Sequence, residues 1–83
     1  MKLTKYVKFR EEKFGGVLFE TRSEKVFTLN PTAAAVVREI QVGGDEAAVL
    51  ARLDGQYRDD GGAMRREAAA YIAELRQKGL VED

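Results

Sequence analysis

The sequence predicts an α+β fold in which a three-stranded antiparallel sheet is followed by three helices. Between residues 6 and 29 apolar residues recur at every second position, as half-buried strands require. From Pro31 onward they recur at every third or fourth position, which indicates helices that bury one face. With 83 residues, of which 45% are hydrophobic, the chain should form a single domain over residues 1–83 around a small core.

Alternation predicts three strands, over Tyr6–Arg10, Gly16–Thr21 and Lys25–Leu29. In the second strand Val17 and Phe19 should share one side. Arg22–Glu24 is short enough for a hairpin loop, so the second and third strands should pair antiparallel. The first and third strands would then flank the second, and the third would have one unpaired side.

The third predicted strand runs directly into a helix. Phe27 and Leu29 lie on one face of the strand, and we assign them to the core. The Asn30 side chain can cap the first free amides of the helix, and Pro31 fits the first helical position, where its missing N–H is not needed. An unpaired edge beside this rigid corner could take up a peptide as an additional strand.

Two helices follow, separated by the Gly43-Gly44 pair. The first should bury a stripe made of Ala33, Val36, Val37 and Ile40, and its small residues Ala34 and Ala35 favour close packing. Asp45 can cap the second helix. We expect the apolar face of that helix to comprise Val49, Leu50, Leu53 and Tyr57, with Gly55 interrupting its end.

A third helix is predicted from about Ala63 to Lys78, with Asp59 or Asp60 as a candidate cap. Gly79 can take the left-handed conformation that ends a helix, and Leu80 and Val81 can fold back as its hydrophobic contact. The expected core stripe is Met64, Ala68, Tyr71, Ile72 and Leu75. The aromatic residues are too few and too evenly spread for a stacking platform, and we assign most of them to the core.

Composition argues against several classes of protein. Fourteen basic and fourteen acidic residues cancel, whereas nucleic-acid binders usually carry a basic excess. Without histidine or cysteine, the chain lacks the commonest general base, the commonest activated nucleophile and any thiolate metal site, so we expect no enzyme activity, metal or cofactor. The glycine pairs lack the Lys-Ser/Thr of a phosphate loop, and the carboxylate pairs Glu11-Glu12 and Asp59-Asp60 are typical of solvated loop charge.

Nothing in the N-terminal segment indicates a signal peptide or a membrane span. Met1–Lys5 leads into alternating polar and apolar residues rather than a continuous apolar run. The absence of cysteine gives no indication of secretion either. A cytoplasmic location is the resulting expectation, with no membrane partner.

One face of the third predicted helix carries a strip of small residues with an arginine at each end. Arg65, Ala69, Ala73 and Arg76 fall at steps of three or four. Beside an open strand edge, this strip would form one wall of a cleft for an extended segment, and the arginines could meet acidic side chains. Alternatively, the alanines merely favour helix and the arginines merely solvate it.

Taken together, these features resemble the PqqD-like family of small peptide chaperones, also called RiPP recognition elements. The resemblance rests on the Gly16–Glu20 strand, Leu29-Asn30 followed by Thr32-Ala33, a second helix ending near Tyr57, and the closing residues Leu75, Gly79, Leu80 and Val81. It covers about Phe14 to Val81. Relatives often carry Asp-Gly after the first helix, where this chain has Val42–Asp45, so that loop can differ in shape.

The resemblance implies a winged helix-turn-helix architecture. It also implies binding of the leader segment of a ribosomally made precursor peptide, which is delivered to a modifying enzyme, often a radical SAM enzyme. Carried onto this sequence, the peptide-binding strand is Lys25, Val26, Phe27, Thr28 and Leu29. The helical wall is Arg65, Ala69, Ile72, Ala73 and Arg76.

Two other classes of protein remain as alternatives. Winged-helix DNA-binding or transcription-accessory proteins use the same helical arrangement. The net charge of zero counts against DNA binding by this chain. A homodimer could instead pair the Lys25–Leu29 edge with that of a second copy. We expect a monomer or a weak homodimer, and no nucleic-acid partner.

Overall fold

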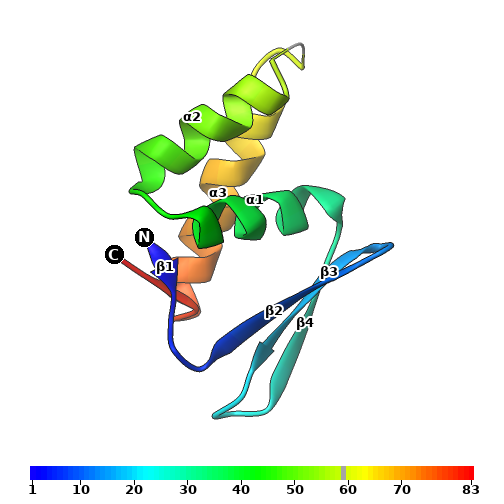
Figure 1. The fold of residues 1–83 in the computed structure, drawn as a ribbon, viewed down its shortest axis with the longest axis vertical. Helices are drawn as coiled ribbons and strands as arrows, with labels where there is room; N and C mark the ends of the chain where they lie inside the picture. Colours follow the sequence, from blue (N-terminus) through cyan, green and yellow to red (C-terminus); the bar gives the residue numbers. More distant parts are fainter. Residues whose placement is uncertain (59) are drawn as a thin grey trace.

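The structure, a computed structural model, describes residues 1–58 and 60–83 and has the predicted order of elements (Figure 1). The sheet order is β2-β3-β4, with antiparallel neighbours. Two further short strands pair the two ends of the chain. The strands are β1 (Lys2–Leu3), β2 (Val7–Glu12), β3 (Gly15–Glu20), β4 (Lys25–Leu29) and β5 (Val81–Glu82), and the helices are α1 (Pro31–Val42), α2 (Glu46–Gln56) and α3 (Ala63–Gln77).

The first hairpin is tighter than the predicted strand bounds, Tyr6–Arg10 and Gly16–Thr21, would imply. Glu11 and Glu12 belong to β2 rather than to a connection, and Glu12 pairs with Gly15 across a two-residue loop. Gly15 adopts a φ of 141°, which favours glycine. A Cβ atom there would lie 2.2 Å from the Leu29 carbonyl oxygen, so only glycine lets the hairpin approach the end of β4 this closely.

The two faces of the sheet differ in burial. Leu18 and Leu29 are buried on the inner face, and Phe27 packs beside them, as predicted for Phe27 and Leu29. Val17 and Phe19 do share a side, but it is the outer face, because the fully buried Leu18 between them points inward.

The assignment of most aromatic residues to the core is wrong. Phe9, Phe27 and Tyr71 are only partly buried against the core. The other four side chains are exposed, namely Tyr6, Phe14, Phe19 and Tyr57. The core is instead aliphatic, and close packing of small side chains takes the place of aromatic bulk.

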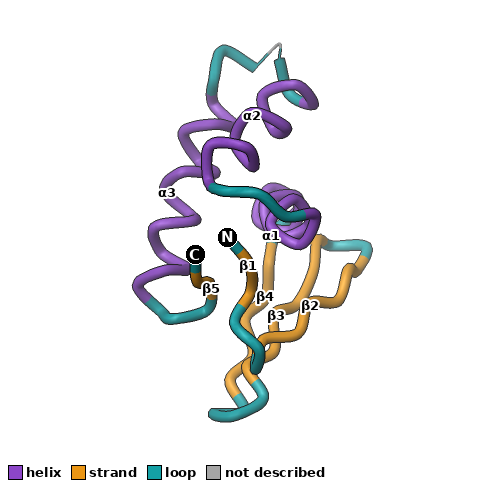
Figure 2. The backbone as a smooth tube through the Cα atoms, turned by 60° about the vertical axis from the view of Figure 1, so that its left-hand side comes forward, coloured by secondary structure: helices purple, strands orange, loops and turns teal. Residues whose placement is uncertain are grey.

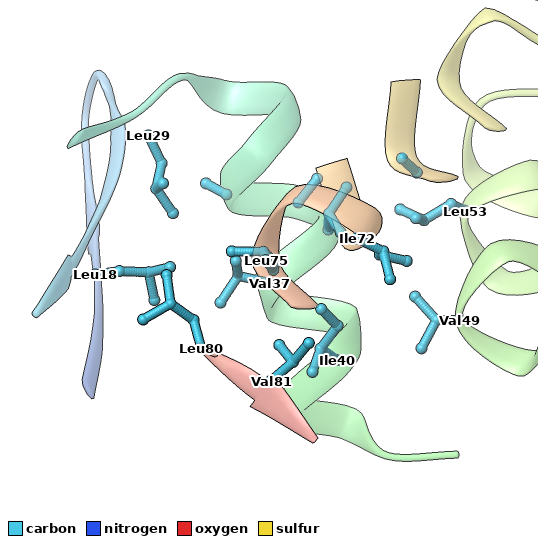
Figure 3. Close-up of a cluster of buried hydrophobic side chains, with 14 of the residues drawn as sticks. Leu18, Leu29, Val37, Ile40, Val49, Leu53, Ile72, Leu75, Leu80 and Val81 are labelled. Carbon is cyan, nitrogen blue, oxygen red and sulfur yellow. The ribbon is translucent and has the colours of Figure 1, made fainter. Parts of the chain in front are cut away.

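The helices pack on the inner face of the sheet, with α1 in the middle of the core. Figure 3 shows Leu18 and Leu29 of the sheet pointing toward Val37 of α1 and the side chains of α3 and β5. Because α1 contacts the sheet, α2 and α3, most of its circumference is covered, and the side with Pro31, Arg38, Gln41 and Val42 remains exposed. Ala34 and Ala35 are therefore buried together with the predicted stripe Val36, Val37 and Ile40, whereas Ala33 is partly buried.

The second helix ends earlier than its predicted apolar face. Val49, Leu50 and Leu53 are buried, but Tyr57 follows the last helical residue and is exposed. Gly55 lies within α2 rather than interrupting it. On α3, Met64, Ala68, Ile72 and Leu75 are buried, with Tyr71 half-buried.

Local signals place the starts of the three helices and the end of α3 as predicted. Asn30 Oδ1 accepts from the Ala33 amide at 2.8 Å, and Asp45 Oδ1 accepts from the Ala48 amide at 2.9 Å. The Asp60 carboxylate accepts from the amides at the start of α3, whereas Asp59 lies outside the described residues. At the other end of α3, Gly79 has a φ of 73° and the next residue, the buried Leu80, donates its amide to Leu75 at 2.9 Å.

Candidate functional site

The strand β4 forms the edge of the sheet that lies toward α3 (Figure 2). One hydrogen bond, next to the start of the β2–β3 ladder, shows which peptide groups of β4 point away from the sheet. There the Thr21 amide donates to the Tyr6 carbonyl at 2.8 Å, beside the Val7–Glu20 pair. Bonded and non-bonded pairs alternate in an antiparallel ladder, so successive residues of β3 turn their peptide groups to β2 and to β4 in turn.

This alternation leaves two residues of β4 with outward peptide groups. The residues of β4 that face β3 are Lys25, Phe27 and Leu29, opposite Glu20, Leu18 and Gly16. The amides and carbonyls of Val26 and Thr28 therefore point away from the sheet. Among the strands of residues 1–58 and 60–83 only β3 pairs with β4, so this edge can accept one more strand.

A groove separates this edge from α3. Its wall on α3 is a single helical stripe at steps of four, three and four residues, formed by Glu67, Tyr71, Glu74 and Lys78. Near Leu29 and Asn30 the charged lining consists of Glu67 and Glu74. Near Phe27 the lining is mixed, with the apolar Leu75 and Leu80 beside Glu74 and Lys78.

Neighbouring charges and burial determine the contacts of Lys78 and the protonation of Tyr71 in the groove. Lys78 Nζ lies 3.4 Å from a Glu74 carboxylate oxygen and 5.2 Å from the centre of the Phe27 ring. Burial, assisted by the neighbouring Glu74 charge, raises the pKa of Tyr71 to about 12. Tyr71 is therefore a neutral phenol near pH 7, and it offers both an apolar ring and a hydroxyl group in the middle of the groove.

The predicted strand residues form this edge, but the predicted helical wall lies elsewhere. Ile72 is completely buried in the core. Arg65 pairs with Asp54 of α2, and Arg76 pairs with Glu46 of α2 and, at 3.0 Å, with Asp83. Both arginines therefore face α2 rather than β4.

The two alanines of the predicted wall do not line the groove either. Ala69 is partly buried against the core, and Ala73 is exposed on the solvent side of α3. At about 100° per residue, the stripe from Arg65 to Arg76 and the stripe from Glu67 to Lys78 lie on opposite flanks of the buried stripe. The prediction selected the flank that packs toward α2.

Sequence reasoning missed the stripe of Glu67, Tyr71, Glu74 and Lys78, although a signal for it was present. Its spacing is as regular as that of the arginine stripe. In addition, α2 carries Glu46 and Asp54, which can pair with two arginines on an antiparallel neighbour. Complementary charges on consecutive helices indicate which flanks face each other.

The described part of the chain contains no group of three or more residues of the types His, Cys, Asp and Glu arranged to hold a metal ion. Among its helices, none has the length and apolar character needed to cross a bilayer.

Two solved structures match nearly the whole chain. "Lasso peptide synthetase B1 complexed with the leader peptide" is 27% identical, with a TM-score of 0.76, and the match covers 99% of this chain and 96% of that one. "TbiB1 in Complex with the TbiA(beta) Leader Peptide" is 18% identical, with a TM-score of 0.81 and coverage of 99% and 95%. The second match supports the fold alone.

A larger protein contains the same fold. The structure of SuiB from Streptococcus suis is 20% identical with a TM-score of 0.56, and the match covers 93% of this chain but only 21% of SuiB. No curated protein matches the sequence. The predicted fold class, three antiparallel strands followed by three helices, is confirmed.

The sequence itself matches a family model. The model is described as Coenzyme PQQ synthesis protein D (PqqD), and it aligns with residues 15–81. That range runs from the start of β3 to the first residue of β5, so it includes both β4 and α3. The chain therefore belongs to the PqqD family.

Proposed function

We propose that the protein binds the leader segment of a ribosomally synthesised precursor peptide as an added strand on β4, beside α3. The observation that carries this proposal is the open edge at Val26 and Thr28, whose peptide groups point into space next to a groove. Two structures of the same fold are complexes with leader peptides, which supports the proposal.

The mode of binding is β-augmentation. The outward groups of β4 fix the register of the peptide through main-chain hydrogen bonds, and the groove selects side chains. Ordering a flexible leader offsets part of the interaction energy, so we expect a dissociation constant near micromolar, about −8 kcal/mol.

The protein acts as a carrier rather than as an enzyme. It holds the leader while the rest of the precursor stays free for a modifying enzyme, and tethering raises the concentration of substrate at that enzyme. The match to part of SuiB, which has also been solved bound to S-adenosylmethionine, supports a radical SAM enzyme as the partner. In this role the protein works in the cytoplasm as a monomer or a weak homodimer.

The groove is less suited to the alternative, DNA binding. Its α3 wall carries Glu67 and Glu74, which would repel phosphates, and the net charge of the chain is zero.

Titration of the precursor leader into ¹⁵N-labelled protein tests the proposal. We expect chemical-shift changes in Lys25–Leu29 and along the stripe of Glu67, Tyr71, Glu74 and Lys78. Changes confined to other segments would contradict the site. An absence of any change at high leader concentration would contradict the function.

Replacing Thr28 with proline deletes one outward amide of the edge. We expect Thr28→Pro to weaken leader binding at least tenfold, about 1.4 kcal/mol, because one main-chain hydrogen bond to the peptide is lost. Isothermal titration calorimetry measures the change.

The matched control is Glu11→Pro on β2, at the opposite edge of the sheet. By the same alternation the Glu11 amide also points outward, but it lies away from α3. Leader affinity should be unchanged in this variant. Equal losses in the two variants would show that proline acts through the stability of the sheet and not through the peptide.

A further inference from the structure

We propose that the groove selects a leader by charge order, with a basic, an apolar and an acidic residue at alternate positions. This inference rests on the proposed function and specifies its ligand. The observation behind it is that the groove carries Glu67 and Glu74 near Leu29, whereas near Phe27 it also contains Leu75, Leu80 and one lysine, Lys78, beside Glu74.

The alternation follows from the hydrogen bonding of β4. A residue in the added strand points to the same face of the sheet as the β4 residue directly opposite. Leu29 is buried and Phe27 packs against the core, so both belong to the inner face, and the two-residue period of the strand puts Lys25 on the same face. The three peptide residues opposite them therefore point into the groove, and the residues between them point outward beside Val26 and Thr28.

The acidic end has two carboxylates and no cation in its lining. Near Leu29 the groove is bounded by Thr28, Asn30, Thr32 and Ala33, with Glu67 and Glu74 from α3. Among the described residues Glu67 has no salt-bridge partner, and Glu74 has only Lys78. A lysine or arginine opposite Leu29 would neutralise this end.

The middle of the groove and its far end differ from the acidic end in their side chains. Phe27, Tyr71, Leu75 and Leu80 surround the central part, which suits an apolar side chain. Lys78 lies over the Phe27 ring at the far rim, and Lys25 begins the strand. An aspartate or glutamate opposite Lys25 would pair with Lys25 across the two strands, at the end of the groove that Lys78 borders.

The lengths of the two walls agree with this assignment. From Glu67 to Lys78, α3 advances about 16 Å at its standard rise. From Lys25 to Leu29, β4 advances about 13 Å. A five-residue stretch of extended peptide therefore spans the groove from its acidic to its basic end.

The direction of the peptide sets the order of its residues. Both strand pairs of the main sheet are antiparallel, and antiparallel pairing is slightly the more stable arrangement. An antiparallel leader passes Leu29 first and Lys25 last. Its recognition segment therefore reads basic, any, apolar, any, acidic from the N-terminus.

A displayed library of twelve-residue peptides with five randomised central positions tests this order, using the full chain as bait. Retained peptides should be enriched in Lys or Arg two positions before an apolar residue and in Asp or Glu two positions after it. The double variant Glu67→Lys with Glu74→Lys should invert the preference at the first position. It should also weaken the best wild-type peptide at least tenfold.

Two further variants make the result specific. Glu11→Lys with Glu12→Lys changes the net charge equally but lies on β2, at the other edge, and should leave the preference intact. Glu67→Gln with Glu74→Gln removes the charges without introducing repulsion and should abolish the preference for a basic residue. Thermal melts of each variant verify folding, and this neutral pair decides the question if the lysine pair fails to fold.

The outcomes separate this inference from the proposed function. Retained peptides without a charge pattern, or with the reverse order, would overturn the charge order and leave peptide binding on β4 intact. Retention of no peptide, together with no response to the precursor leader, would overturn both.

Discussion

Glu39 on α1 is the one charged side chain that is buried among residues 1–58 and 60–83, and it holds two helices together. Its carboxylate accepts from Arg52 at 2.8 Å and from Gln56 at 3.0 Å, both on α2. Arg52 also donates to the carbonyls of Glu39 and Gly43, at 2.8 and 2.6 Å, where α1 ends. Glu39 and Arg52 therefore neutralise each other, and Arg52 also donates to carbonyls near the end of α1 that lack a helical partner.

This network should make stability depend on pH. The hydrogen bonds from Gln56 and Arg52 hold the pKa of Glu39 below its ordinary value of 4.5. A lowered folded-state pKa means that the contribution is complete above the unfolded value and is lost as pH falls through the folded one. We therefore expect the free energy of unfolding to fall as pH drops below 4.5, measured by urea denaturation at a series of pH values.

The variant Glu39→Gln isolates this contribution. It should be less stable than the wild type at pH 7, because Arg52 loses its anion, and its stability should depend less on pH in the acidic range. Equal slopes in the two proteins would show that other carboxylates cause the acid sensitivity.

At the scale of residues, sequence predicted what depends on neighbours in the chain. The caps at Asn30 and Asp45 were predictable because each side chain bonds to an amide three residues ahead. The pair of Glu39 and Arg52 was not, because it depends on how α1 and α2 cross. Polar residues at those positions carry no local sign of burial.

At the scale of elements, the sequence predicted which residues of α3 are buried, but not which flank of that buried stripe lies beside the sheet. Periodicity identified Met64, Ala68, Ile72 and Leu75, because burial of a helix face leaves a period in the sequence. Either flank of such a stripe can lie beside the sheet. Which one does so depends on the packing of α2, and the arginine stripe faces that helix.

The double variant Arg65→Glu with Arg76→Glu distinguishes the two flanks. Leader affinity should stay within about twofold, because neither arginine lines the groove. The free energy of unfolding should fall, since exposed pairs with α2 are replaced by like charges. Calorimetric titration and urea denaturation measure the two effects.

Restoring one pair provides the control. Arg65→Asp with Asp54→Arg reverses the polarity of the contact between α2 and α3 and should regain most of the stability that Arg65→Asp alone loses. A tenfold loss of leader affinity in the arginine double variant would show that the peptide crosses the α2 side of α3.

At the scale of the whole molecule, the sequence predicted the order of elements but not the joining of the two ends. The pairing of β1 with β5 brings the two ends of the chain together, with Leu3 opposite Val81 (Figure 1). Val81 is buried in the core and Leu3 packs against it. Two-residue strands are too short to show a period. Only the hydrophobic contact after α3, at Leu80 and Val81, was visible in the sequence, and both residues are buried.

The groove lies between the sheet and α3, so a bound leader should stabilise the whole domain. A ligand that binds only the folded state stabilises it by about 2.7 kcal/mol at a hundredfold excess over the dissociation constant. For a domain of this size that corresponds to a rise in Tm of roughly 10–20 °C, measured by differential scanning calorimetry with and without leader. At the same leader concentration Thr28→Pro should show a smaller rise, because its dissociation constant is higher, whereas Glu11→Pro should match the wild type. A leader that produces chemical-shift changes but no rise in Tm would have to bind the unfolded chain equally well, which contradicts recognition by a preformed strand edge.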